Sequence, residues 1–172
     1  MSKARSNGDL VASDLITTDI SNDYIGIGSG TPSAKLDVLG DVKLAGLMKE
    51  SLTIVSGKLS DNSDINLDDG MVHFFTTTET TTVDPNIFSS TGINTETSIG
   101  ETIAVNIITT CAAAGYTTAI SIDGATQTVK WINGILPYDG GSSGNDIYSF
   151  QILKTADETY TVFGTLTNFA AG

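Results

Sequence analysis

Apolar and polar residues alternate along much of this chain, and the alternating runs are short. From Tyr24, apolar side chains stand at Ile25 and Ile27, and after the turn-forming stretch "SGTP" they return at Leu36 and Val38. A period of two is typical of strands, whereas no long segment shows the three-and-four spacing of an amphipathic helix. The pattern therefore predicts short β-strands.

The second part of the chain is richer in residues that favour strands. Glycine or aspartate turns separate five such stretches, which are "MVHFFTTTETTTV", "ETIAVNIITTCA", "YTTAISIDGATQTVKWING", "DIYSFQILKT" and "TYTVFGTLTNFA". Asp123-Gly124 tolerates positive φ at both central positions of a hairpin turn, and a second hairpin is expected to turn within "TADET", residues 155–159. We predict an all-β, jelly-roll-like β-sandwich over residues 70–172.

The sequence before this domain predicts only a small hydrophobic core. Strands as short as those in residues 24–69 cannot bury enough apolar surface alone, so they need partners from the rest of the chain or from other chains. Residues 1–23 are polar and lack either period, although "LVASDLITTDI" is compatible with a short strand or an arm that orders on a partner. The expected organisation is an attachment arm over 1–23, a β-ribbon or collar over 24–69 and a distal domain over 70–172.

The charge balance excludes several classes of partner. Among 172 residues there are 8 Lys+Arg against 20 Asp+Glu, and the formal net charge of -12 repels phosphate backbones and anionic lipid. No stretch reaches the roughly 18 apolar residues of a membrane helix. The opening "MSKARSNGDL" lacks the apolar run of an export signal. We therefore expect no nucleic acid partner, no membrane insertion, and synthesis in a cytoplasm.

Few residues suggest catalysis or metal binding. His73 is the one histidine and no nucleophile motif accompanies it, so a packed histidine is favoured. Cys111 stands among small and apolar neighbours, which favours a buried thiol. The best cluster of hard ligands is Asp61, Asn62, Asp64, Asn66, Asp68 and Asp69. Its spacing differs from that of a helix-flanked Ca²⁺ loop, so a solvated acidic turn is the favoured interpretation, with an ion site as the alternative. No metal or cofactor is predicted.

Paired carboxylates leave a glycosidase as a minor alternative. The acidic residues near predicted loops are Asp139, Asp146, Asp157 and Glu158. In a chain with 20 acidic residues, some will lie near loops whatever the function, and the predicted domain has no deep cleft. The Gly-rich "YDGGSSGND" is too irregular for a phosphate cradle and is interpreted as an exposed loop. We therefore expect that the chain is not an enzyme.

Aromatic residues near that loop are candidates for recognition. Trp131 and Tyr148 alternate with polar residues as core-facing side chains of strands do, so they are assigned to the core. Tyr138, between Pro137 and Asp139, is the better surface candidate. An aromatic face beside Asp and Asn suits contact with a glycan or a protein. The candidate ligand-binding residues are Tyr138, Asp139, Asn145 and Asp146.

The stretch "IGIGSGTPSAKLDVLGDVKL" resembles a short repeat that precedes the distal domains of bacteriophage tail fibres and related spike proteins. The matching residues are Gly26, Ile27, Gly28, Pro32, Ser33, Lys35, Leu36, Asp37, Val38 and Gly40. The resemblance implies a homotrimer in which three copies wrap one axis. In such a ribbon Ile27, Leu36 and Val38 would form the trimer interface, because they share a strand face, while Lys35 and Asp37 would point outward.

Two further segments resemble virion structural proteins. The opening "MSKAR" is similar to the start of such proteins in tailed phages, especially phages of marine cyanobacteria, and "YTVFGTLTNF" is similar to their C-terminal modules. Fibres with this repeat often continue into a self-cleaving chaperone domain, which nothing here matches.

The resemblance implies a function in the virion. We expect a trimeric short fibre or spike that attaches to the host surface, with the arm contacting other virion proteins. The alternatives are a fibre or decoration protein of the capsid head that stabilises the particle, and an adhesion module of a bacterial surface, against which the missing export signal counts.

Overall fold

The computed structural model describes residues 15–170, and nearly all of its regular structure is β-strand. The one α-helix among these residues is the single turn α2 (Ile93–Glu96), so the all-β prediction is confirmed. The described residues contain no helix long and apolar enough to span a bilayer. The chain divides into two compact units, Met1–Met48 and Lys49–Gly172, and each is described by itself.

The first unit holds a three-stranded sheet. Its strands are β1 (Ile16–Asp19), β2 (Tyr24–Ile27) and β3 (Leu36–Val38), in the order β1-β2-β3. β1 and β2 form an antiparallel hairpin, while β3 runs parallel to β2 because residues 28–35 return the chain to the other end of the sheet. Part of the predicted arm is thus a strand of this sheet, whereas residues 1–14, which include "MSKAR", lie outside the described residues.

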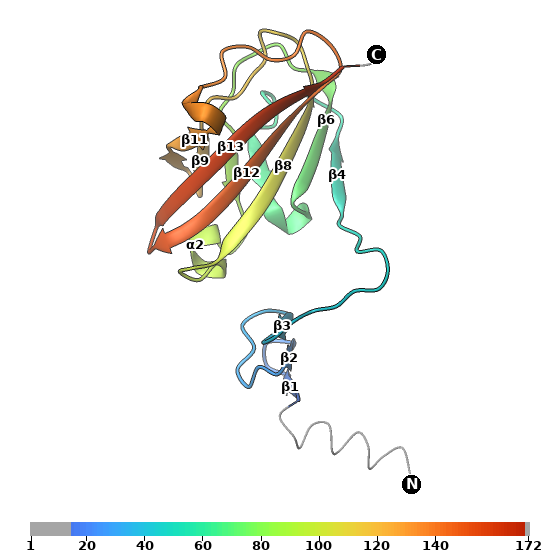
Figure 1. The fold of residues 1–172 in the computed structure, drawn as a ribbon, viewed down its shortest axis with the longest axis vertical. Helices are drawn as coiled ribbons and strands as arrows, with labels where there is room; N and C mark the ends of the chain where they lie inside the picture. The colour runs from blue at the N-terminus through green and yellow to red at the C-terminus, as the bar shows by residue number, and fades with distance from the viewer. Residues whose placement is uncertain (1–14, 171–172) are drawn as a thin grey trace. The chain divides into compact units, whose positions relative to one another are not determined.

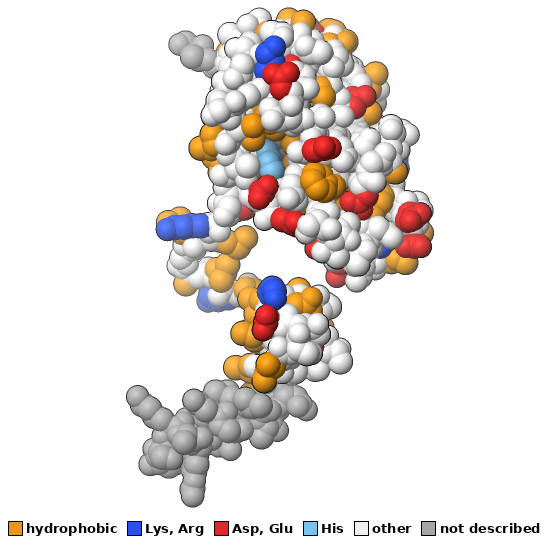
Figure 2. Space-filling view, turned by 180° about the vertical axis from the view of Figure 1, so that it is seen from behind, with side chains coloured by type: hydrophobic (Ala, Val, Ile, Leu, Met, Phe, Trp, Pro, Cys, Tyr) orange, Lys and Arg blue, Asp and Glu red, His pale blue; other side chains and the backbone are white. Residues whose placement is uncertain are grey.

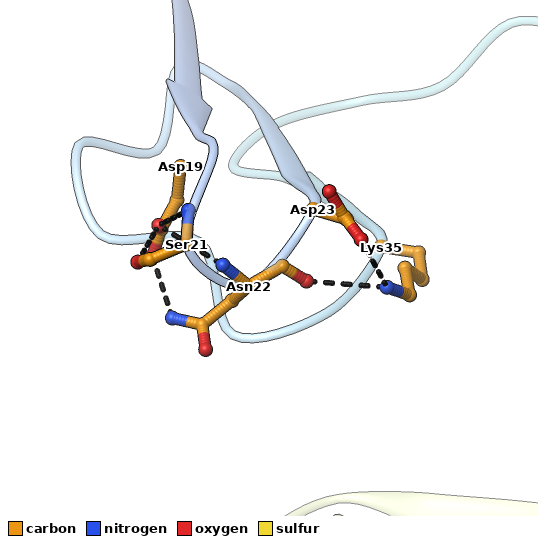
Figure 3. A network of polar contacts seen from close by, with 5 residues as sticks. All are labelled: Asp19, Ser21, Asn22, Asp23 and Lys35. Atoms are coloured by element: carbon orange, nitrogen blue, oxygen red, sulfur yellow. Dashed lines mark hydrogen bonds and ion pairs between the residues drawn. The ribbon is translucent and has the colours of Figure 1, made fainter.

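A polar network closes the β1–β2 hairpin (Figure 3). The Asp19 carboxylate accepts hydrogen bonds from the backbone and side chains of Ser21 and Asn22, and these bonds lower the pKa of Asp19. Asp23 takes a left-handed φ of 57° to complete the turn. Lys35 Nζ donates to the Asn22 carbonyl at 3.1 Å and lies 3.9 Å from the Asp23 carboxylate. These contacts tie the segment before β3 to the hairpin turn.

The second unit consists of two packed sheets (Figure 1). The larger sheet has the order β11-β13-β12-β8-β6-β4, and the smaller has the order β10-β9-β7-β5. The larger sheet contains β4 (Leu52–Val55), β6 (Val72–Thr78), β8 (Thr102–Thr110), β11 (Val129–Trp131), β12 (Asn145–Ala156) and β13 (Thr159–Phe169). The smaller contains β5 (Asp64–Asn66), β7 (Asn86–Phe88), β9 (Ile120–Ile122) and β10 (Ala125–Gln127). Two short 3₁₀ turns cover Leu67–Asp69 and Ile132–Gly134.

Successive strands from β4 to β9 alternate between the two sheets. Each strand therefore meets its neighbour in the same sheet only after a full circuit through the other sheet, and the pairs β4–β6, β6–β8, β5–β7 and β7–β9 are parallel. Hairpins would have made them antiparallel. A jelly roll belongs to the antiparallel architectures, and this winding half of the unit departs from that pattern. The later strands return to antiparallel pairing in β8–β12 and β12–β13.

The winding moves the start of this unit earlier than the sequence analysis placed it. β4 and β5 fall within residues 24–69, the predicted ribbon, yet they pair with β6 and β7 in the two sheets. The unit begins at Lys49 and not at residue 70. Leu59 and Ile65, from this early part, are buried in the core of the same unit.

Both predicted hairpin turns are confirmed. Asp123 and Gly124 join β9 to β10 with φ values of 48° and 83°, the positive pair that a tight primed turn requires. Asp157 and Glu158 join β12 to β13, and Glu158 has φ 50°. The second hairpin pairs eleven positions of β12 with β13, with one irregularity near Lys154, which makes it the longest ladder of the chain's described part.

The core lies between the two sheets. The larger sheet contributes inward side chains such as Phe75, Ile107 and Phe150, and the smaller contributes Ile87 and Ile122. The assignments of two aromatic residues to the core are confirmed. Trp131 packs edge to face on Phe150 with 5.9 Å between ring centroids, and Tyr148 stacks on the same ring.

Candidate assembly and recognition surfaces

One face of the N-terminal sheet is apolar and exposed. The parallel register places Leu36 beside Ile25, and Val38 beside Ile27, so four aliphatic side chains share this face. The exposed fractions are 61 % for Leu36, 46 % for Ile25 and 45 % for Ile27. Within the first unit alone, much of the apolar surface on this face is therefore exposed to water.

The opposite face of this sheet is covered by its own loop. Asp37 accepts hydrogen bonds from the backbone and hydroxyl of Ser33 and from the hydroxyl of Ser29. A Cβ on Gly26 would lie 2.3 Å from the Ser29 carbonyl oxygen, so only glycine permits this close approach. Asp37 points away from the Leu36 side, as strand alternation requires, but its carboxylate holds the loop and is not free.

Exposed aliphatic residues continue along the chain after β3. They are Leu39, Val42, Leu44, Leu47 and Met48, followed by Leu52 and Ile54 in β4. Residues 40–51 contain no strand or helix, and every residue from 39 to 52 is exposed. An exposed apolar run of this length is uncommon on soluble monomers.

A second exposed apolar surface surrounds residues 132–139 of the C-terminal unit. A hollow of about 240 Å³ is lined by Ile132, Asn133, Ile135, Leu136, Pro137, Tyr138, Asp139 and Leu166. Tyr138 is 76 % exposed, so its prediction as a surface aromatic is confirmed. Asn133 has φ 58° and Gly134 φ 69°, a left-handed pair that turns the chain sharply between Ile132 and Ile135. An aromatic ring beside an amide and a carboxylate suits a glycan or a peptide.

The four candidate ligand-binding residues do not form one site. Tyr138 and Asp139 are exposed at the hollow, but Asp146 is 0 % exposed. Its carboxylate accepts the backbone N–H of Gly141 at 2.9 Å and the amide of Asn168 at 3.1 Å. Asn145 is half-buried and donates to the Thr109 carbonyl. Asp146 therefore anchors the loop before β12 to β13, and it is not available to a ligand at the surface.

Burial of Asp146 affects two neighbours. Burial, and then the negative charge of Asp146, raise the pKa of the Cys111 thiol and of the Tyr148 phenol. The prediction of a buried, unpaired Cys111 is confirmed. A thiol whose pKa is raised carries little thiolate, which is the nucleophilic form.

The acidic residues of the possible ion site are used inside the fold. Hydrogen bonds from the side chain and then from the backbone N–H of Ser90 lower the pKa of Asp68. Asp64 accepts from the Asn86 amide, and Asn66 caps the 3₁₀ turn by accepting the Asp68 N–H. No group of three or more metal-ligating side chains comes together in residues 15–170. These bonds tie β5 and the 3₁₀ turn to β7 and to Ser90 after it.

The other candidate chemical groups are dispersed. His73 is buried on β6 with Nε2 2.9 Å from the Gly70 carbonyl oxygen, as expected of a packed histidine. Asp157 and Glu158 lie at the hairpin turn, while Asp146 lies eleven residues before Asp157 along β12, or about 36 Å at strand spacing. Glycosidase carboxyl pairs lie within roughly 10 Å of each other, so Asp146 does not form such a pair with either acid of the turn. Asp157 and Glu158 lie instead near Asp123, where Asn94 donates to both Asp123 and Asp157.

Two features of these surfaces were missing from the sequence analysis. Ile132, Ile135 and Leu136 line the hollow, although the sequence signal was present in "WINGILPY", where an Asn-Gly turn interrupts apolar residues that cannot share one strand face. Leu47 and Met48 are among the most exposed aliphatic residues described. They follow no alternation, so the pattern gave no reason to assign them to an interface.

Comparison with models of known protein families, with curated proteins and with solved structures found no match to this chain.

Proposed function

We propose that this chain is a structural protein of a bacteriophage virion, assembled as a homotrimeric short fibre or spike that contacts the host surface. The observation that carries the proposal is the exposed apolar surface of the N-terminal sheet and of residues 39–54. Three copies around one axis would supply each other with the core that a single copy lacks. A virion provides a setting in which such chains act only as an assembly.

The sequence repeat supports the same assembly. Its residues lie on β2, β3 and the loop between them, where Gly26 permits the close approach of the loop. In the proposed trimer Ile27, Leu36 and Val38 face the partner copies, and residues 1–23 contact other virion proteins. The exposed, charge-poor character of the Leu36 side is suited to burial against identical copies.

The hollow around Tyr138 is the proposed site of host contact. It is apolar, it is shallow, and it combines an exposed aromatic ring with Asn133 and Asp139. Such a surface binds by stacking and a few polar contacts, so we propose adhesion to a host glycan or protein without catalysis. No cofactor or metal takes part in this proposal.

Immunogold labelling tests the location. Antibodies raised against the purified chain should label intact phage particles that carry it, at the tail for a host-attachment fibre. Label at the head would assign the chain to a head fibre or decoration protein. Label on bacterial envelopes, with none on purified particles, would contradict the virion proposal and favour an adhesion module.

A further inference from the structure

The outward face of the larger sheet carries an apolar row that crosses four strands. In the register of the sheet Ile54 of β4 lies beside Phe74 of β6, Phe74 beside Ile108 of β8, and Ile108 beside Ile147 of β12. Leu52 and Val72 extend this row by a second pair. Their strand neighbours, such as Phe75 and Ile107, point into the core, so the row lies on the outer side of the sheet.

This outer face also lacks charge. The outward positions of β4, β6, β8, β12 and β13, all of them described, hold only apolar, Thr, Ser, Asn, Gln and Ala side chains. Charges border this face at Lys130 on the edge strand β11, whose ammonium lies 5.6 Å from the Phe163 ring centroid, and at Glu101, which lines a hollow with Gln151 and Phe163. The carboxylates gather elsewhere, and Figure 2 shows several of them on the opposite side of this unit. A charge-free face of this extent is unusual in a chain with 20 acidic residues.

Among the described residues of this unit, no other element covers the face. Figure 1 shows β13, β12, β8, β6 and β4 side by side on the viewer's side, with no strand or helix in front of them. Five strands at ~4.8 Å spacing and the nine residues of β8 at ~3.4 Å give about 700 Å². A specific interface needs roughly 800 Å² per partner, so the face is close to the size that a stable association requires.

We propose that this outer sheet face is a self-association surface, occupied by further copies of the same chain; the proposal rests on the trimeric assembly of the proposed function. Two copies of a chain with a net charge of -12 repel each other wherever their acidic surfaces meet, and this face removes that repulsion. The outward positions of β4, β6, β8, β12 and β13 offer no charged group to an acidic or a basic partner, which leaves an identical face as the best complement.

The dimensions agree with three copies around an axis. The apolar row spans four strands, about 19 Å, and three faces of that width closed as a triangular prism would lie about 5 to 6 Å from the axis. This distance from the axis is close to half of the ~10 Å that separates two packed sheets. Side chains of the size of Phe74 and Ile108 therefore fill such a prism without a central channel.

Sedimentation velocity on the full chain tests the proposal with Ile108→Asp and Ile99→Asp. Ile108→Asp places an unpaired carboxylate in the centre of each proposed interface, and the concentration for half-assembly should rise by about a hundredfold. Ile99 is exposed outside the sheet, so the same substitution there should leave assembly unchanged. Equal assembly of the two variants would overturn the proposal.

Hydroxyl-radical labelling of the wild-type chain gives a second readout, which decides the question if Ile108→Asp fails to fold. Phe74 should lose reactivity on assembly, while the exposed Tyr138 keeps its reactivity. Phe74 equally reactive in the monomer and the assembly would refute this face as the interface. A trimer with reactive Phe74 would contradict this inference alone, whereas a wild-type chain that stays monomeric would contradict the proposed function as well.

Discussion

Leu36 of β3 lies directly beside Ile25 of β2 in a parallel register, and both side chains are exposed. In a single copy, the loop that hydrogen-bonds to Asp37 covers the opposite face of the sheet, while the face that carries this pair is open to water. In the proposed trimer, identical chains cover the open side of this pair.

Leu36→Asp should abolish or strongly weaken the trimer. Three carboxylates would meet near one axis, and burial of each without a partner costs several kcal/mol, against about ±0.5 kcal/mol for an ordinary surface change. The control is Lys35→Gln, because Lys35 alternates with Leu36 and its exposed ammonium contacts Asn22, Asp23 and the Tyr24 ring at the hairpin turn. Sedimentation of both variants at equal concentration measures the effect, and equal loss in the two would show that the strand faces the other way.

Asp146→Leu should destabilise the C-terminal unit. The substitution leaves the partly buried Gly141 N–H without its acceptor and removes one of the bonds of the Asn168 amide, which costs about 1–3 kcal/mol. Urea unfolding measures the change in the free energy of unfolding. Asp139→Leu, at an exposed loop position, is the control and should change it by less than about 0.5 kcal/mol. Similar values for both variants would mean that Asp146 does not anchor the loop.

Glu79 predicts a specific loss of stability in acid. Burial alone would raise its pKa, but hydrogen bonds from Ser60, Thr81 and Thr80 outweigh burial and hold the pKa below its ordinary 4.5. A lowered pKa stabilises the fold above 4.5, and this contribution is lost as the pH falls through the lowered pKa.

Glu79→Gln should therefore be less stable than wild type near neutral pH, and the difference should shrink as the solution is acidified. Urea unfolding along a pH series measures both chains. A constant difference at every pH would show that the charge of Glu79 contributes nothing.

Gly164→Val should weaken the packing of β11 on β13. A Cβ at Gly164 would lie 2.6 Å from a methyl of Val129 and 3.1 Å from the Trp131 ring, so the ring would have to move. Overpacking of this kind costs about 1–3 kcal/mol. The Trp131 fluorescence spectrum and the thermal midpoint should both change, and an unaltered midpoint would mean that the edge strand adapts freely.

Tyr138→Ala should reduce binding of the assembled chain to host cells without changing its assembly or its thermal midpoint. The ring is exposed and makes no core contact, so its removal affects only the hollow. Flow cytometry with labelled protein measures the binding, and Tyr24→Ala, an aromatic truncation on the N-terminal sheet, is the control. Undiminished binding of Tyr138→Ala would remove the hollow from the account of host contact.

Local features of the fold could be predicted from the sequence, because alternation and turn chemistry act over a few residues. The turns at Asp123-Gly124 and at residues 157–158, the buried Trp131 and the exposed Tyr138 all follow from short-range patterns. The winding of β4 to β9 could not be predicted, since each parallel pair joins segments separated by a circuit through the other sheet.

The candidate site was predictable only in part, for the same reason. Asp146 stands in a polar loop sequence, and its burial depends on Asn168, 22 residues later in the partner strand. The uncharged outer face of the larger sheet could not be predicted from any single strand. It is recognised only when the outward positions of five strands are compared in register.

Sedimentation equilibrium of the purified full chain at micromolar concentration distinguishes the proposed trimer from a monomer. One chain has a mass of 17.9 kDa, and we expect a single species of three chain masses that keeps its β-sheet circular dichroism on dilution until it dissociates. A folded, stable species of one chain mass at that concentration would contradict the trimer and, with it, the assignment of the apolar face of the N-terminal sheet and of residues 39–54 to an interface between copies.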